Sequence, residues 1–320
     1  MIRSALGRLA RAARRRVRSK GPIVLMYHRV DKLAVDPWQL AVSPDHFAGQ
    51  LAMLRRRRDV VPLSWLAAQL SAGRLPARAA ALTFDDGYGD VFRNALPILE
   101  AEQCPATVFV TTGAIGSRTE FWWDRLSRIV YEATPPREEI VLAFGGAAHS
   151  FRLGSGGPNR DALHGRLHAL LKAAPVEARQ HALDRLAEWT GVKSEGAEGN
   201  LAMSADDLRK LSSSQLIEIG AHTVSHPSMP ELSTRDLERE VVTSRNVCEA
   251  MTGRAVSGFA YPYGDHSAAA AAAVRAAGFS YACTTEGRAV RSDDDPMSIP
   301  RLLAPDWDGS RLERELRRYD

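Results

Sequence analysis

The chain has 320 residues, of which 45% are hydrophobic and 25% charged, and this composition is typical of a soluble globular protein. The length allows one large α/β domain with an inserted segment. No stretch approaches the roughly 18 apolar residues of a membrane-spanning helix. Three scattered cysteines, Cys104, Cys248 and Cys283, lack the spacing of a disulfide framework, so we expect buried thiols in a reducing compartment.

The formal net charge of +4 comes from the first twenty residues, which hold eight basic side chains and no acidic one. The rest of the chain has 34 basic and 38 acidic side chains, which argues against a nucleic-acid groove in the fold. Apolar residues three and four apart would give residues 1–20 an apolar stripe for an anionic membrane surface. A disordered, solvated tail explains them equally well.

No continuous apolar core follows the charges of residues 1–20, so they do not have the pattern of a secretory signal. We therefore expect a cytoplasmic protein, peripheral to the inner membrane face if the tail binds there.

Short apolar runs alternate with helical patterns in two blocks of the chain, and this βαβ alternation implies a parallel sheet. The first block predicts strands at 23–27, 81–84 and 106–110, with helices near 44–57 and 90–102. The second block predicts strands at 217–221, 258–261 and 279–284, a helix from a Ser233 cap to about Met251, and a helix near 267–277.

Between the blocks, roughly at 118–204, the alternation fails. A helical segment begins at Phe121, a glycine-rich hairpin-like stretch follows from about 145 to 157, and a long amphipathic helix is expected near 159–190. We interpret this segment as a mainly helical insertion on the loop side of the α/β domain.

Two adjacent carboxylates follow the apolar run Ala79-Ala80-Ala81-Leu82, in the sequence Thr83-Phe84-Asp85-Asp86-Gly87-Tyr88. The carboxyl ends of parallel strands form the functional rim of an α/β sheet. Neighbouring residues of an extended chain point to opposite sides, so Asp85 and Asp86 can serve different partners. A metal ligand beside a general base is one such division.

A second polar cluster, His222-Thr223-Val224-Ser225-His226, follows the apolar run that ends at Ala221. Two imidazoles and one carboxylate leave an open position on a divalent ion. A lone H-x-x-x-H pattern is more often incidental. Its pairing with the two aspartates makes a metal site the better interpretation.

The third motif is Gly258-Phe259-Ala260-Tyr261-Pro262-Tyr263-Gly264, which alone indicates only a strand that ends in a turn. In their order and spacing the three motifs resemble the NodB-homology polysaccharide deacetylases, carbohydrate esterase family 4. The resemblance covers roughly 21–117 and 205–305. It implies a distorted (β/α)7 barrel at 21–117 and 205–320, interrupted by the helical insertion 118–204.

The resemblance also implies roles for the motif residues. Asp86, His222 and His226 would hold a divalent metal, most readily Zn²⁺, although Co²⁺, Ni²⁺ and Fe²⁺ suit the same ligands. Asp85 would be the general base. The backbone N–H of Tyr263, next to Pro262, would stabilise the oxyanion of the reaction.

The chain departs from the family pattern in two places. It has no histidine after His266, where the family usually keeps its general acid, so we assign that role to His28 of Met26-Tyr27-His28-Arg29, as in permuted members. A His that caps the strand end is the alternative.

Ala260 stands where many members of the family have an arginine that orients the base, and Arg301 is our substitute, although an arginine is a surface residue by default. Asp306 and Trp307 are candidates for lining the groove or supporting His28. The Trp122-Trp123 pair either stacks on a sugar or, as aromatic residues more often do, anchors the core of the insertion. The remaining histidines are expected to be ordinary surface or structural residues: His46, His149, His164, His168, His181 and His266.

The resemblance thus predicts a metal-dependent hydrolase that removes N-acetyl groups from an amino sugar of a polysaccharide or of its lipid-linked precursor. An O-acetyl esterase on the same fold is the first alternative, because water, metal and base serve either carbonyl. A non-catalytic sugar-binding barrel is the second. The intact set Asp85, Asp86, His222 and His226 argues against it.

Overall fold

The computed structural model describes residues 21–132, 139–144, 147–152, 157–192 and 196–319. The predicted basic tail, residues 1–20, lies outside the described residues, so its membrane contact stays a prediction. In the described part of the chain, no helix combines the length and apolar character needed to cross a bilayer.

A parallel sheet forms the centre of the molecule, in the strand order β11-β10-β9-β6-β5-β1-β12, with β4 paired to β5. All of its pairings are parallel, as the βαβ alternation predicts. The strands are β1 (Ile23–Tyr27), β4 (Asp59–Val60), β5 (Ala79–Phe84), β6 (Ala106–Val110), β9 (Ile217–Ala221), β10 (Gly258–Ala260), β11 (Tyr281–Cys283) and β12 (Leu302–Leu303). A small separate pair consists of β2 (Arg29–Val30) and β3 (Ala41–Val42).

The segment 299–303 joins the two edges of this sheet. Ile299 forms a parallel bridge with Cys283 of β11, and Leu302 pairs with Leu25 of β1. The sheet therefore curls into the predicted distorted barrel. Arg301 lies between these two contacts and is fully buried.

The strands are apolar on both faces, as is expected of a covered parallel sheet. In β1, Ile23, Leu25 and Tyr27 belong to the large core under the helices, whereas Val24 belongs to a second cluster with Phe109 and Tyr281. The alternation follows from the two-residue period of a strand. Polar residues are therefore concentrated where the strands end.

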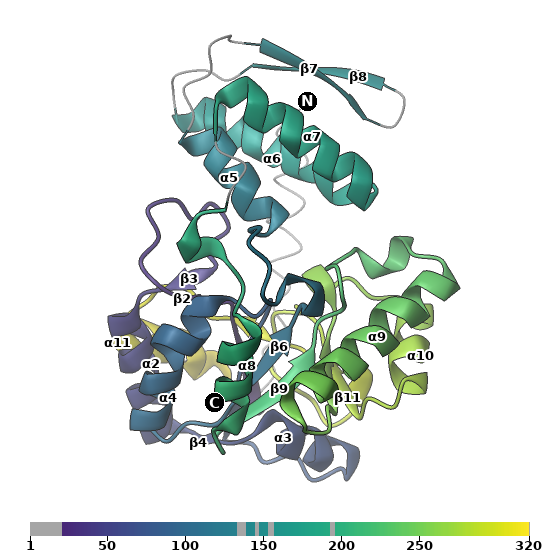
Figure 1. The fold of residues 1–320 in the computed structure, drawn as a ribbon. Helices are drawn as coiled ribbons and strands as arrows, with labels where there is room; N and C mark the ends of the chain where they lie inside the picture. The colour runs from purple at the N-terminus through teal and green to yellow at the C-terminus, as the bar shows by residue number, and fades with distance from the viewer. Residues whose placement is uncertain (1–20, 133–138, 145–146, 153–156, 193–195, 320) are drawn as a thin grey trace.

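Helices cover the outside of the sheet, with α2, α4 and α11 on one flank and α9 and α10 on the other (Figure 1). The helices of the barrel are α2 (Pro44–Arg57), α3 (Leu63–Ser71), α4 (Leu96–Ala101), α8 (Ala205–Ser213), α9 (Thr234–Thr252), α10 (Ala268–Ala276) and α11 (Gly309–Leu316). A π-helical turn, η1 (Val91–Ala95), precedes α4. The predicted start of α9 is confirmed, because the Ser233 side chain accepts a hydrogen bond from the backbone N–H of Asp236.

The described residues of the segment 118–204 lie over the carboxyl ends of the strands (Figure 1). They comprise α5 (Trp122–Tyr131), the antiparallel pair β7 (Glu139–Phe144) and β8 (Ala147–Arg152), α6 (Gly157–Ala173) and α7 (Val176–Thr190). Leucines of α6 and α7 pack with Phe151 and Ile129 in a hydrophobic cluster of their own. The predicted single helix at 159–190 is wrong, because Pro175 separates two helices and cannot continue the first.

Candidate active site

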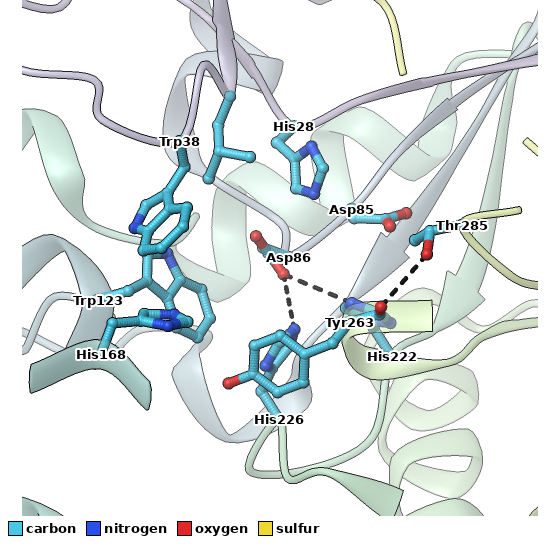
Figure 2. Close-up of a pocket in the computed structure, with 11 residues that line it drawn as sticks. His28, Trp38, Asp85, Asp86, Trp123, His168, His222, His226, Tyr263 and Thr285 are labelled. Carbon is cyan, nitrogen blue, oxygen red and sulfur yellow. Dashed lines mark hydrogen bonds and ion pairs between the residues drawn. The ribbon is translucent and has the colours of Figure 1, made fainter. Parts of the chain in front are cut away.

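A cavity of about 290 Å³ lies at the carboxyl ends of the strands (Figure 2). It brings together six residues that the sequence motifs single out, and it adds residues from the loop after β2 and from the insertion. The barrel contributes His28, Asp85, Asp86, His222, His226, Tyr263 and Thr285; the loop contributes Trp38 and Leu40; the insertion contributes Trp123 and His168.

Asp86, His222 and His226 form a compact set of potential metal ligands. All three are buried, and their ligating atoms lie within 4.8 Å of one another. Asp86 Oδ1 is 3.5 Å from His222 Nε2 and 3.3 Å from His226 Nε2. His222 Nδ1 is 2.7 Å from the carbonyl oxygen of Ala260, to which it must donate, so His222 Nε2 presents its lone pair to Asp86.

The same set fits a cation electrostatically. Asp86 Oδ1 is buried without a hydrogen-bond partner among the described residues, which is unusual for a carboxylate oxygen. Burial lowers the pKa of His222, and it lowers that of His226 to about 3, so both rings are neutral near pH 7. Neutral imidazole is the form that ligates a metal. These residues therefore fit a divalent ion.

An unusual backbone conformation helps to orient three residues of the site. Asp86, His226 and Tyr263 have φ values of 71°, 53° and 60°, in the left-handed region that non-glycine residues seldom adopt. Each such residue costs on the order of 1–3 kcal/mol and persists only where the surroundings hold it. For the His222–His226 turn, the Glu240 carboxylate of α9 supplies that support, since it accepts hydrogen bonds from the backbone N–H groups of Val224 (2.8 Å) and Ser225 (3.0 Å).

Asp85 points away from the metal set and forms a bidentate pair with Arg301. The guanidinium Nη1 and Nη2 lie 2.6 and 2.7 Å from the two carboxylate oxygens. Arg301 also donates to the carbonyl of Thr284 and to the hydroxyl of Thr83. Burial alone would raise the pKa of Asp85, but the charge and hydrogen bonds of Arg301, together with the neighbouring histidines, outweigh burial and hold this pKa far below its usual range.

The Asp85–Arg301 pair bears on the second departure from the family pattern, the alanine at position 260. Ala260 offers no guanidinium to the base, and Arg301 reaches the same carboxylate from the segment that joins the sheet edges. Arg301 thus makes the contact with Asp85 that the resemblance expects of an orienting cation.

His28 follows β1 and lies across the pocket from His226 (Figure 2). Its Nδ1 is enclosed and lacks a hydrogen-bond partner in the described part of the chain. Burial lowers the pKa of His28, against the raising effect of Asp86 and Asp85. The next residue, Arg29, is anchored by Asp90 at 2.9 Å and lies 4.5 Å over the Tyr88 ring, which fixes the strand end.

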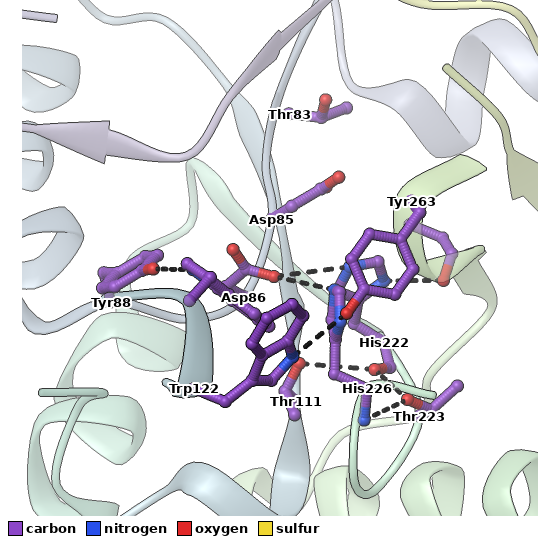
Figure 3. Close-up of polar contacts among 12 residues, drawn as sticks. Thr83, Asp85, Asp86, Tyr88, Thr111, Trp122, His222, Thr223, His226 and Tyr263 are labelled. Atoms are coloured by element: carbon purple, nitrogen blue, oxygen red, sulfur yellow. Dashed lines mark hydrogen bonds and ion pairs between the residues drawn. The ribbon is translucent and has the colours of Figure 1, made fainter. Parts of the chain in front are cut away.

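Tyr263 is held by contacts from both the barrel (Figure 2) and the insertion (Figure 3). The Thr285 hydroxyl donates to its carbonyl at 3.3 Å. From the insertion, Trp122 Nε1 donates to the Tyr263 hydroxyl at 3.2 Å, and Lys172 Nζ lies 4.2 Å from the Tyr263 ring centroid. Lys172 also pairs with Asp265 at 2.7 Å. The insertion thereby grips the turn that carries the candidate oxyanion donor.

Two predicted site residues, Trp307 and Pro262, lie elsewhere. Neither lines the cavity, and Pro262 is buried at the start of the 3₁₀ turn η5 (Pro262–Gly264). The Arg311 guanidinium lies 4.5 Å over the Trp307 ring. Asp306 accepts hydrogen bonds from Ser43 and pairs with His46, so it does not support His28 as expected.

Two residues of the insertion, His168 and Trp123, line the cavity although no sequence motif assigned them to the site. His168, predicted to be ordinary, lines the cavity and stacks on Trp122 with ring centroids 4.9 Å apart. Trp123 is buried in the main core and also faces the cavity, 4.7 Å from the His226 ring. No motif signals His168, because its position depends on how α6 packs on the barrel. Trp123 thus serves both packing and the pocket wall, and Trp122 contacts Tyr263 and His168.

Comparison with known proteins is consistent with this geometry. The family model described as polysaccharide deacetylase matches residues 72–134 and 157–282, so the match includes part of the segment interpreted as an insertion. The poly-beta-1,6-N-acetyl-D-glucosamine N-deacetylase of Escherichia coli (strain K12) is 33% identical over 88 residues, which are 27% of this chain and 13% of that protein.

The protein of the same name from Staphylococcus aureus (strain MSSA476) is 27% identical over 119 residues, covering 33% of this chain and 41% of the relative. The chain thus spans less than half of either curated relative. Solved structures show the shared fold. IcaB from Ammonifex degensii has a TM-score of 0.61 and 21% identity, covering 94% of this chain and 98% of its own.

The Streptococcus pyogenes deacetylase PplD, solved in complex with acetate, has a TM-score of 0.59 and 18% identity, covering 92% of this chain and 98% of its own. The family match covers more than half of the chain and includes all three motifs. The chain belongs to the polysaccharide deacetylase family.

Proposed function

We propose that this protein is a metal-dependent hydrolase that removes N-acetyl groups from amino-sugar units of a polysaccharide or of its lipid-linked precursor. The observation that carries the proposal is the division of two adjacent carboxylates: Asp86 faces His222 and His226, and Asp85 is held by Arg301. Family membership and the names of the E. coli and S. aureus relatives support a polymer of N-acetylglucosamine as the substrate.

Asp86, His222 and His226 would hold the cation, which when bound lowers the pKa of a water molecule and polarises the acetyl carbonyl. Two imidazoles and one carboxylate favour Zn²⁺, and Co²⁺, Ni²⁺ and Fe²⁺ suit the same donors. His222 is prepared for this role by its hydrogen bond to Ala260, which fixes the ring orientation.

Asp85 would accept the proton of the attacking water. The bidentate contact with Arg301 fixes the carboxylate plane, and each oxygen keeps a lone pair for a further hydrogen bond. The same contact makes Asp85 a weaker base, since it holds the pKa low. Arg301 would therefore lower the basicity of Asp85 while keeping its carboxylate ionised and oriented.

The remaining steps fall to the opposite walls of the cavity. The backbone N–H of Tyr263 would donate to the oxyanion of the tetrahedral intermediate, a contact whose loss typically costs about 10²-fold or more in rate. His28, across the cavity, would deliver a proton to the leaving amine nitrogen as the C–N bond breaks. The free amine and acetate are the products.

The experiment is acetate release from β-1,6-linked N-acetylglucosamine oligomers, with O-acetylated glycans beside them. Zinc-loaded protein should release acetate from the N-acetyl substrates, lose that activity on treatment with a chelator, and regain it on metal addition. Acetate from O-acetyl substrates alone would establish an esterase, and glycan binding without acetate release a non-catalytic barrel.

A further inference from the structure

A second cavity, of about 540 Å³, adjoins the candidate active site. One wall is the loop 34–39 after β2, and the other is formed by α5 and α6 of the insertion. The two cavities share Trp38, whose side chain lines both. The volume is within the range of about 300–1,000 Å³ that is usual for ligand sites in proteins.

The loop wall is fixed before any ligand arrives. The two carboxylate oxygens of Asp36 accept hydrogen bonds from the backbone N–H groups of Leu40 and Ala41, each at 2.9 Å. Gln39, which lies between Asp36 and Leu40 in the loop, adopts a φ of 54°. Trp38 is held against α6, with its ring centroid 4.2 Å from that of His168 and 5.2 Å from that of His164, and 38% of its surface stays exposed.

The insertion wall carries polar groups, and a glycine in it leaves free space. The Tyr131 hydroxyl donates to Asp161 Oδ1 at 2.7 Å, which leaves the second carboxylate oxygen for another donor. Gly165 of α6 also lines this wall, and a Cβ built there would meet no heavy atom within 4 Å. The missing side chain therefore leaves room in the cavity.

An exposed indole face beside carboxylates and the Gln39 amide is the chemistry that binds a sugar, because the ring packs on the apolar face and the polar groups take the hydroxyls. The described residues that line this cavity include Asp36 and Asp161 but no lysine or arginine. The wall thus favours neutral or amine-bearing sugars and repels uronic acids.

We propose that this cavity, bounded by Trp38, Gln39, Tyr131, Asp161 and Gly165, is a subsite for the neighbouring unit of a neutral or amine-bearing hexosamine chain. The inference rests on the proposed function, because it assumes that the adjoining cavity holds the sugar that is deacetylated. The insertion then selects chain length, so that an oligomer that spans both cavities is a better substrate than a single N-acetylglucosamine.

Gly165→Phe tests the subsite, because Gly165 lines the cavity and a Cβ there meets no heavy atom within 4 Å, so the added ring takes up space in the cavity outside the catalytic residues. Ala178→Phe, on an exposed position of α7, is the control. In the wild type, kcat/KM for acetate release should rise with oligomer length. In Gly165→Phe, kcat/KM on the longer oligomers should be about tenfold lower than in the wild type, which corresponds to the loss of one aromatic contact. Its kcat/KM for the monosaccharide should equal that of the control.

Each outcome decides the matter. A wild type without length dependence, or a Gly165→Phe variant that keeps it, would overturn the subsite while leaving the deacetylase intact. Equal rates on uronate-containing oligomers would overturn its charge selectivity. If no substrate yields acetate, the proposed function fails. Calorimetric binding of a β-1,6-linked N-acetylglucosamine pentamer then decides the subsite. Weaker binding by Gly165→Phe than by Ala178→Phe upholds the subsite, and equal binding refutes it.

Discussion

The two walls of the catalytic cavity are built differently. On the sheet wall, Arg301 and Asp85 are 0% and 4% exposed in their side chains and are fixed by several hydrogen bonds at once. On the insertion side, Lys172 is 30% exposed and pairs with Asp265 of the barrel, which is 39% exposed. Lys172 also lies over the Tyr263 ring, and Trp122 donates to the Tyr263 hydroxyl. The carboxylates and imidazoles assigned to the chemistry thus follow strands of the sheet, whereas the contacts of Lys172 with the Tyr263 turn are partly exposed.

The largest expected effect follows from breaking the sheet wall with Arg301→Met. It leaves the Asp85 carboxylate buried without its cation, and loss of one partner of a buried pair costs roughly 3–5 kcal/mol of unfolding free energy. The rate of acetate release should fall as well. Urea unfolding measures the loss of unfolding free energy. Arg185→Met, which removes a 53% exposed arginine, should cost well under about 1 kcal/mol, and equal losses in both variants would contradict the contrast.

Next in size is the loss of metal from the sheet wall. His226→Gln removes a buried imidazole from the ligand set, so the purified variant should retain much less than the single equivalent of metal expected of the wild type. Elemental analysis after dialysis measures this. His181→Gln is the control, and a His226→Gln variant with full metal content would disprove the assignment.

A smaller effect is expected on the insertion side. Lys172→Met removes the ion pair with Asp265 and the cation over Tyr263, so the Tyr263 turn is less firmly placed and kcat should fall about tenfold. Metal content and unfolding free energy should stay near those of the wild type. Lys172→Arg should recover part of the rate. Loss of metal in Lys172→Met would show that the two walls are not independent.

The smallest effect is a pH dependence of stability in the insertion. Burial lowers the pKa of His164 to about 4, against the raising effect of Asp161. Because an unfolded histidine has a pKa of about 6.5, the folded state binds fewer protons, and its stability should fall as the pH drops from about 6.5 to about 4. Unfolding at about pH 7.5 and pH 5 measures this slope. His164→Gln should make the slope shallower, with the remainder supplied by His168 and His226, whose pKa values burial also lowers; an unchanged slope would exclude His164 as a source.

The sequence was most informative where chemistry lies at strand ends. The three motifs follow β5, β9 and β10, whose carboxyl ends meet at one rim because the sheet is parallel, so the predicted side chains had to converge. Arg301 could be inferred because Ala260 left the base without a cation. The structure places it on the segment that pairs with β1, within reach of Asp85.

The rest depended on packing that no local pattern encodes. His168 and Lys172 reach the site only because α6 lies across the carboxyl ends of the strands. The helical pattern continues through Pro175, which hid the break between α6 and α7. Trp307 follows the last strand, as a groove residue might be expected to do, but its ring is covered by Arg311.

The most direct test of the account compares two conservative substitutions at neighbouring positions, Asp85→Asn and Asp86→Asn, by metal content and acetate release together. Asp85→Asn is expected to keep its metal and lose turnover, because Asp85 faces Arg301. Asp86→Asn is expected to lose both, because Asp86 faces His222 and His226. Loss of metal from Asp85→Asn, or an Asp86→Asn variant that keeps metal and turnover, would contradict the division of roles.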